Sequence, residues 1–173
     1  MDLWGHHVVG RDDRPLTELR ALRPYADAVA GSRARDDNWQ ICSLEPGADL
    51  ADSLALLVQL AAETGAPALL ASVTSDESAS VEGFSGPAGY WRAFIPSRRP
   101  QLRRVTPVPA PVADEVAAGA ARWAAAAGHS VAPGPIVELL CASENTGTDD
   151  VLEELLNRLG LTSPPVDALA RTT

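Results

Sequence analysis

The stretch from Ala68 to Ile95, ALLASVTSDESASVEGFSGPAGYWRAFI, decides the fold. Residues 68–74 are a continuous apolar run of strand length, and residues 78–84 alternate between apolar and polar positions. Residues 90–95 form a third such run, and the polar and Gly-Pro turns between the three are short. Three strands joined by short turns predict an antiparallel meander with one face packed and one face solvated.

Upstream of the meander, strand and helix patterns alternate. Residues 3–9 and 38–44 have the length and composition of short strands. A helix is expected over residues 16–30, where Pro24 would kink or divide it. A clearer amphipathic helix covers residues 49–65, with Asp49 as its N-cap and a glycine where a C-cap belongs. The first half therefore has the order β-α-β-α-β-β-β.

The second half has a different character. Residues 96–111 form a connection rich in proline and arginine, residues 112–160 carry three helical patterns, and residues 161–173 form a tail. Residues 1–95 supply the sheet. We expect one domain over residues 1–173, of class α+β, with a mainly antiparallel sheet and the helical C-terminal part packed against it.

The composition excludes several chemistries. The chain of 173 residues has 23 acids and 14 basic residues, and every basic residue is an arginine. Without lysine there is no Walker A loop and no Schiff base, so P-loop hydrolysis and pyridoxal-type catalysis are excluded. With a net charge of −9, binding to nucleic acid is disfavoured. No cofactor is predicted.

The first residues, the apolar runs and the cysteines of the chain bear on its cellular location. Residues 1–4 lack the basic and apolar regions of a signal peptide. The longest charge-free run, residues 123–137, is shorter than the roughly 20 residues of a membrane span. Cys42 and Cys141 do not make a disulfide framework. These features predict a cytoplasmic, reduced protein that does not bind membranes.

Charge is unevenly distributed. Residues 92–104 hold five arginines and no acid, whereas both flanking regions are acidic. Four of these arginines are candidates for binding an anion through their guanidinium groups: Arg98, Arg99, Arg103 and Arg104. Pairing with carboxylates of the same chain is the alternative. The acidic flanks would steer a basic partner toward the protein.

No catalytic residue and no metal site is predicted. His6 and His7 would point to opposite faces of a strand, so they do not share a metal unaided. The segment GFSG at residues 83–86 lacks the spacing of a nucleophile elbow and is interpreted as a turn. Acidic doublets recur in loops and helix starts, where capping or solvation is their ordinary role, and no Ca²⁺-loop spacing appears.

Two parts of the sequence resemble a known group. The segment 64–95 resembles a segment of small actinobacterial proteins, and ARWAAAAGHS around Trp123 and DDVLEELLNRLGL near the end are similar to their helical tail. Those proteins look like the small acidic immunity-type proteins encoded beside toxin genes. The resemblance covers about half the chain. It implies a binding role and transfers no site residue.

The sequence therefore predicts a non-enzymatic protein-binding module, most simply an immunity-type inhibitor of a cognate toxin with a basic surface. The alternatives are a chaperone or adaptor for a secreted effector, and a small biosynthetic enzyme or ligand-binding protein. Tryptophans are frequent interface anchors, although they are more often core residues. The candidate partner-binding residues are Asp36, Asp37, Trp39, Asp76, Glu77 and Trp91.

Overall fold

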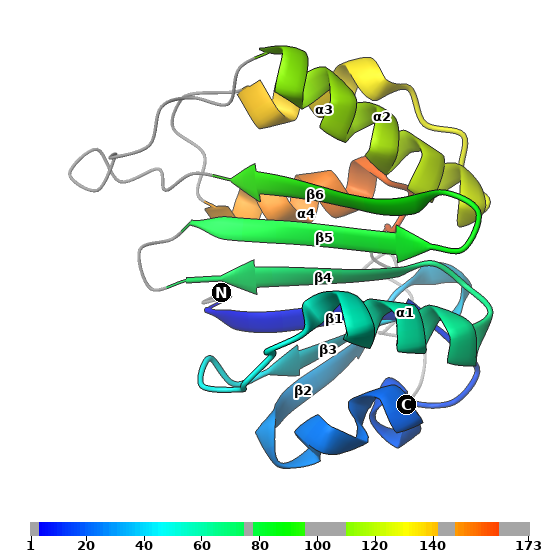
Figure 1. Cartoon of the computed structure of the whole chain (residues 1–173), viewed down its shortest axis with the longest axis vertical. Coiled ribbons are helices and arrows are strands. Elements are labelled where there is room, and N and C mark those ends of the chain that lie inside the picture. Colours follow the sequence, from blue (N-terminus) through cyan, green and yellow to red (C-terminus); the bar gives the residue numbers. More distant parts are fainter. Residues whose placement is uncertain (1–3, 75–77, 96–109, 142–147, 163–173) are drawn as a thin grey trace, which may run out of the picture.

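One sheet of six antiparallel strands organises the chain, in the order β2-β3-β1-β4-β5-β6 (Figure 1). The computed structural model describes residues 4–74, 78–95, 110–141 and 148–162. The strands are β1 Gly5–Arg11, β2 Val29–Ala34, β3 Trp39–Leu44, β4 Ala68–Val73, β5 Ala79–Ser85 and β6 Gly89–Ile95. The predicted meander is confirmed as β4-β5-β6, and β1 lies between β3 and β4.

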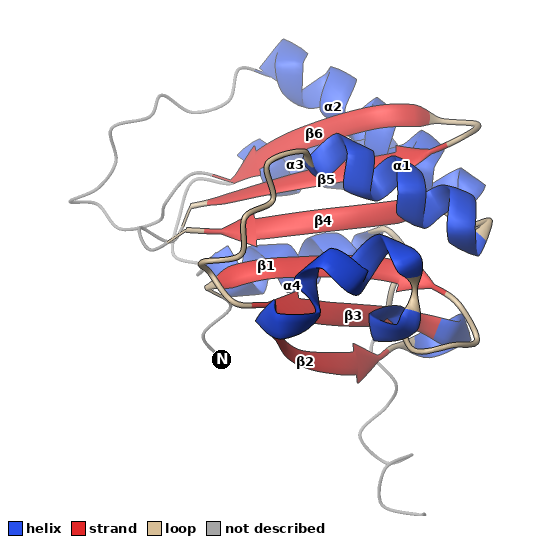
Figure 2. Cartoon of the chain, turned by 60° about the horizontal axis from the view of Figure 1, so that its bottom comes forward, coloured by secondary structure: helices blue, strands red, loops and turns tan. Residues whose placement is uncertain are grey.

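Helices cover both faces of the sheet (Figure 2). The short 3₁₀ helices are η1 Leu16–Glu18, η2 Arg20–Ala28 and η3 Asp36–Asn38, and the α-helices are α1 Ser53–Thr64, α2 Ala110–Ala126, α3 Pro133–Cys141 and α4 Thr148–Arg158. On one face η1, η2 and α1 pack over the sheet, and on the other face α2, α3 and α4 do so. The α+β class with a helical C-terminal part is therefore correct.

The strand pattern divides the buried residues into two cores. In β1, Val8 faces α1 and η2, whereas Val9 faces the C-terminal helices, because successive side chains point to opposite faces. Every residue of β4 except Ser72 is buried. The expected solvated face is therefore wrong for β4, where helices cover both sides, but it holds for β6, whose burial alternates.

The segment 16–30 differs from the prediction of an α-helix. Leu16, Leu19 and Leu22 are fully buried, and Tyr25 packs against the same core. A spacing of three residues eclipses side chains in a 3₁₀ helix, so this sequence buries its apolar side chains best with three residues per turn.

One strand and the start of one helix also differ from the prediction. Strand β2 was not predicted, because Val29–Ala34 is an edge strand in which no side chain is fully buried, and it lacks the apolar alternation that identifies a strand. Helix α1 takes Asp52 as its N-cap instead of Asp49, and the Asp52 carboxylate accepts a hydrogen bond from Ala55 N at 2.9 Å. Its C-cap is Gly65, as predicted, in the left-handed conformation.

No helix in the part of the chain that the structure describes is long and apolar enough to cross a membrane.

Candidate functional site

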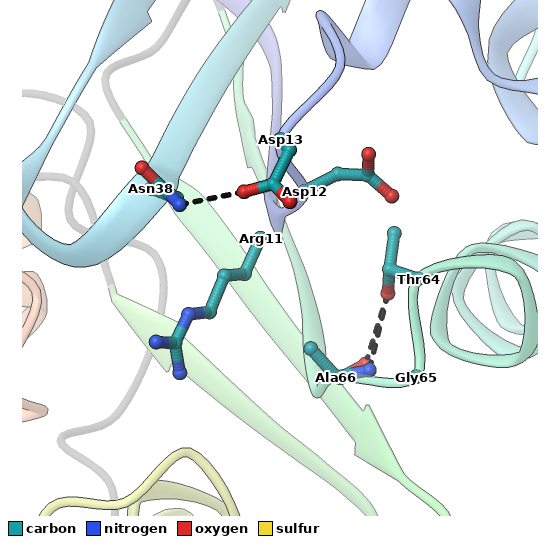
Figure 3. Close-up of a pocket in the computed structure, with 7 residues that line it drawn as sticks. All are labelled: Arg11, Asp12, Asp13, Asn38, Thr64, Gly65 and Ala66. Carbon is teal, nitrogen blue, oxygen red and sulfur yellow. Dashed lines mark hydrogen bonds between the residues drawn. The ribbon is translucent and has the colours of Figure 1, made fainter.

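Two acidic loops meet at one end of the sheet. Asp12 and Asp13 follow the last residue of β1, and the η3 segment with Asp36 and Asp37 precedes β3. The pairing of β1 with β3 brings the two loops together. Asn38 then links them, because its Nδ2 donates a hydrogen bond to Asp13 Oδ1 at 2.7 Å (Figure 3). Two acidic doublets that lie 24 residues apart in the sequence thus become neighbours.

A pocket of about 350 Å³ opens at this end of the sheet. It is lined by Arg11, Asp12, Asp13, Asn38, Thr64, Gly65 and Ala66. The Thr64 hydroxyl donates to Leu60 O and accepts from Ala66 N, so it serves the end of α1. The groups that remain for a ligand are carboxylates and the Arg11 guanidinium, which makes the pocket polar and charged.

The backbone of the second loop is strained. Asp37 and Asn38 have φ values of 56° and 63°, in the left-handed region that most side chains avoid. Aspartate and asparagine tolerate this conformation better than other non-glycine residues, which explains why they occupy these positions. Arg35 N closes the loop by donating to Trp39 O at 2.7 Å. The loop therefore has one defined shape, and it presents Asp37 to solvent.

Two arginines near the site, Arg14 and Arg35, are engaged by acids. Arg14 forms an ion pair with Asp12 at 3.1 Å, and its hydrogen bonds lower the pKa of the Asp12 carboxyl below its usual range. Asp36 accepts from Thr162 Oγ1 at 2.7 Å. Within the described residues, no arginine pairs with Asp13 or Asp37. These two carboxylates supply the negative charge that is available to a partner.

An ion pair in which the arginine is buried and the glutamate is partly exposed anchors this end of the sheet to the C-terminal helices. The Arg35 side chain is only 3% exposed, and its Nη2 lies 2.7 Å from both carboxylate oxygens of Glu153 in α4. Its Nη1 donates to the carbonyl oxygen of Leu161. Because Arg35 directly precedes η3, this contact fixes the position of Asp36 and Asp37 relative to α4.

The predicted partner-binding residues separate into three groups. Asp36 and Asp37 lie where the two acidic loops meet, at the end of the sheet that we call the acidic end (Asp12, Asp13, Asp36 and Asp37). Trp39 and Trp91 are core residues, 1% and 5% exposed, so neither indole offers surface to a partner. Trp39 packs against Trp123 with ring centroids 5.7 Å apart. Asp76 and Glu77, like the anion-binding candidates Arg98, Arg99, Arg103 and Arg104, lie outside the described residues.

Sequence reasoning missed the contributions of Arg11, Asn38 and Thr64 to the pocket. Asp12 and Asp13 form one of the acidic doublets for which the sequence predicts only capping or solvation. The available signal was the run Asp36-Asp37-Asn38 between two strands, since these residue types favour tight turns with left-handed backbone.

The histidines do point to opposite faces of β1, as predicted. His6 Nδ1 lies 2.9 Å from Ser72 Oγ, and His7 Nδ1 lies 3.0 Å from Ser43 Oγ. Each histidine thus pairs with a serine on the neighbouring strand. Among the residues that the structure describes, no group of three or more His, Cys, Asp or Glu side chains could hold a metal ion.

Cys42 and Ser85 occupy structural positions. Cys42 is buried in β3, and burial raises the pKa of its thiol, while Cys141 is exposed at the end of α3. Neither is in a disulfide. Ser85 Oγ accepts a hydrogen bond from Ala88 N at 3.0 Å, so it stabilises the β5–β6 turn, in agreement with its interpretation as a turn residue.

Comparison of the chain with protein-family models, with curated proteins and with solved structures finds no match.

Proposed function

We propose that the protein is a non-enzymatic, protein-binding module of the immunity type, and that its acidic end binds a basic segment of a cognate toxin. The observation that carries this proposal is the convergence of two acidic loops around one polar pocket, with Asp13 and Asp37 not paired to any described arginine. The resemblance to small acidic immunity-type proteins supports the same class.

Charge favours this partner chemistry. A net charge of −9 attracts a basic protein over a distance of about one Debye length, roughly 8–10 Å at physiological salt. The carboxylates at the acidic end then offer acceptors for arginine or lysine side chains of the partner. Such complementarity mainly raises the association rate and selects the partner.

The pocket itself favours a charged side chain over a small apolar ligand. Pockets for small molecules are lined mostly by apolar and aromatic groups. In this pocket Arg11, Asp12, Asp13 and Asn38 provide charged or polar side chains, and no large apolar side chain lines it. A basic residue of a partner protein is a better match to these groups.

The test replaces the two available carboxylates by amides. The variant Asp13→Asn, Asp37→Asn keeps the oxygen that accepts from Asn38, and asparagine tolerates the left-handed backbone at position 37. We expect at least a tenfold weaker affinity for the co-encoded toxin, mostly through a slower association, and a weaker dependence on salt, as measured by surface plasmon resonance.

The matched control is Asp114→Asn, Glu115→Gln, which changes the net charge equally but in α2, where both residues are exposed. We expect affinity within about twofold of the wild type. An equal loss in both variants would show that only net charge matters, and no loss in the Asp13, Asp37 variant would overturn the proposal. A toxin that is bound but remains active would favour the chaperone alternative.

A further inference from the structure

A further cavity opens where β2 forms an edge of the sheet (Figure 2). Its volume is about 300 Å³, and its lining comes from the start of β1, from β2, and from the end of β3 with the turn that follows. The lining residues that matter for its chemistry are Trp4, His7, Gly31, Arg33, Ser43 and Glu45. The cavity shares no residue with the pocket at the acidic end.

A hydroxyl group and an imidazole are paired inside this cavity. Ser43 and His7 are direct partners in the β1–β3 register, and Ser43 Oγ lies 3.0 Å from His7 Nδ1. At this distance an imidazole can take the proton of a hydroxyl group that attacks an electrophile. His7 is only 7% exposed, whereas Ser43 is half-buried. The imidazole is therefore held in place while the hydroxyl group stays within reach of the cavity.

Gly31 leaves room for a ligand beside Ser43. It is the partner of Ser43 in the β2–β3 register, so His7, Ser43 and Gly31 form a row on one side of three neighbouring strands. A Cβ added at Gly31 would have no atom within 4 Å. The row therefore ends in open space on the side of Ser43 that lies away from His7, and a ligand can approach the hydroxyl group from there.

We infer that Ser43 is a nucleophile activated by His7, and that it accepts the acyl group of an activated ester bound in this cavity. Ser43 Oγ forms a bond to the carbonyl carbon of the ester, and His7 Nδ1 takes the proton from Oγ. The bond between the acyl carbon and the alcohol oxygen then breaks, and this oxygen takes the proton from His7. The products are an ester of Ser43 and the free alcohol. This modification site does not rest on the proposed binding of a toxin.

The walls of the cavity favour an ester with a short apolar acyl group. Trp4 and Pro46 provide apolar surface, and a volume of about 300 Å³ suits a small ligand. Arg33 lies on the same side of β2 as Gly31, because side chains two residues apart share a face. Its positive charge favours the oxyanion that forms when the carbonyl group is attacked. Glu45, the other charged residue of the lining, is exposed to solvent.

The pair of His6 and Ser72 provides an internal comparison on the other side of the sheet. These residues are direct partners in the β1–β4 register, and His6 Nδ1 lies 2.9 Å from Ser72 Oγ. Ser72 is half-buried, as Ser43 is. It lines neither this cavity nor the pocket at the acidic end. The two pairs thus have the same chemistry, and the cavity distinguishes them.

The test treats the full chain with p-nitrophenyl acetate and locates acetyl groups by mass spectrometry of its peptides. The chain has no lysine, so no side-chain amine competes for the acetyl group. Neutral hydroxylamine then removes acetyl groups from thiols, phenols and imidazoles, including the exposed thiol of Cys141, but not from serine. We expect one stable acetyl group, on Ser43. His7→Asn should slow its appearance roughly 100-fold, because the general base is lost.

The matched control is His6→Asn, which removes the imidazole of the other pair and should leave the rate at Ser43 within about twofold of the wild type. Circular dichroism establishes that both variants remain folded. A wild type without acetyl on Ser43 overturns the inference, as does an equal rate at Ser72 in the same sample. Acetylation of Ser43 that is equally fast in a folded His7→Asn variant overturns it too. None of these results depends on the acidic end.

Discussion

Gly83 shows how one missing side chain determines the packing of a tryptophan. It faces Trp91 across the β5–β6 pair, and a Cβ added at Gly83 would lie 2.2 Å from the indole Nε1. Trp91 is also close to Gly119 of α2, where an added Cβ would lie 2.9 Å from its own Cβ. The Trp91 side chain therefore fits between two glycines, with its indole against Gly83 of the sheet and its Cβ against Gly119 of α2.

We predict that Gly83→Ala destabilises the protein by about 2–3 kcal/mol, because the rigid strand and the indole must both move. The free energy of unfolding from urea titration measures the effect. Gly31→Ala is the control: nothing lies within 4 Å of its added Cβ, and we expect a change within about 0.5 kcal/mol. Similar losses at both positions would contradict the packing argument.

His6 makes the stability depend on pH. Burial, and then the neighbouring His7, lower the pKa of His6 below its usual value of 6.5. The unfolded chain therefore takes up a proton at a higher pH than the folded chain does. The contribution of neutral His6 to the free energy of unfolding is complete above pH 6.5. It is lost as the pH falls through the lower pKa that His6 has in the folded state.

We expect the unfolding free energy of the wild type to decrease between pH 7.5 and 5 more steeply than that of His6→Asn, which cannot titrate but can still bond to Ser72. Urea titrations at several pH values measure both slopes. Equal slopes would show that His6 does not contribute to the acid sensitivity.

At the scale of elements, the pair Arg35–Glu153 joins the end of β2 to α4. We predict that Glu153→Ala destabilises the protein by about 2 kcal/mol, since it leaves a buried guanidinium without its carboxylate. Glu154→Ala, which removes the more exposed pair with Arg158 one residue further on, should cost about 0.5 kcal/mol or less. Thermal unfolding followed by circular dichroism distinguishes the two. Equal shifts in both variants would show that burial of Arg35 adds nothing to this pair.

Elements with a strong hydrophobic period could be predicted from the sequence. The strands of the meander follow from a continuous apolar run or from alternation, and the helices after residue 110 follow from apolar stripes. Glycines also mark the ends of α2 and α4. The 3₁₀ segment and β2 could not be predicted in this way. Leucines three residues apart also suit an α-helix, and the edge strand β2 buries too little to leave a pattern.

The acidic end could be predicted only in part, for a different reason. The doublet Asp36-Asp37 is visible in the sequence, as is Asp12-Asp13. Their proximity depends on the register that places Arg11 opposite Trp39, and this requires that β3 pairs with β1. Strand pairing between distant segments is a property of the whole fold, so local patterns do not contain it.

For the whole molecule, charge and apolar surface are separated. The acidic end presents Asp13 and Asp37, whereas the exposed apolar side chains Leu54, Val58, Tyr90 and Phe94 lie on α1 and β6.

The division of the sheet into two cores also has a consequence for synthesis on the ribosome. Every buried member of the core beneath α1 and η2 lies between Val8 and Leu70, while the opposite core requires the helices that end with α4. The first hydrophobic layer can thus form before α2, α3 and α4 emerge. Until they do, the other side of the sheet, including Trp39, remains exposed to water, because the helices that bury it have not yet been synthesised.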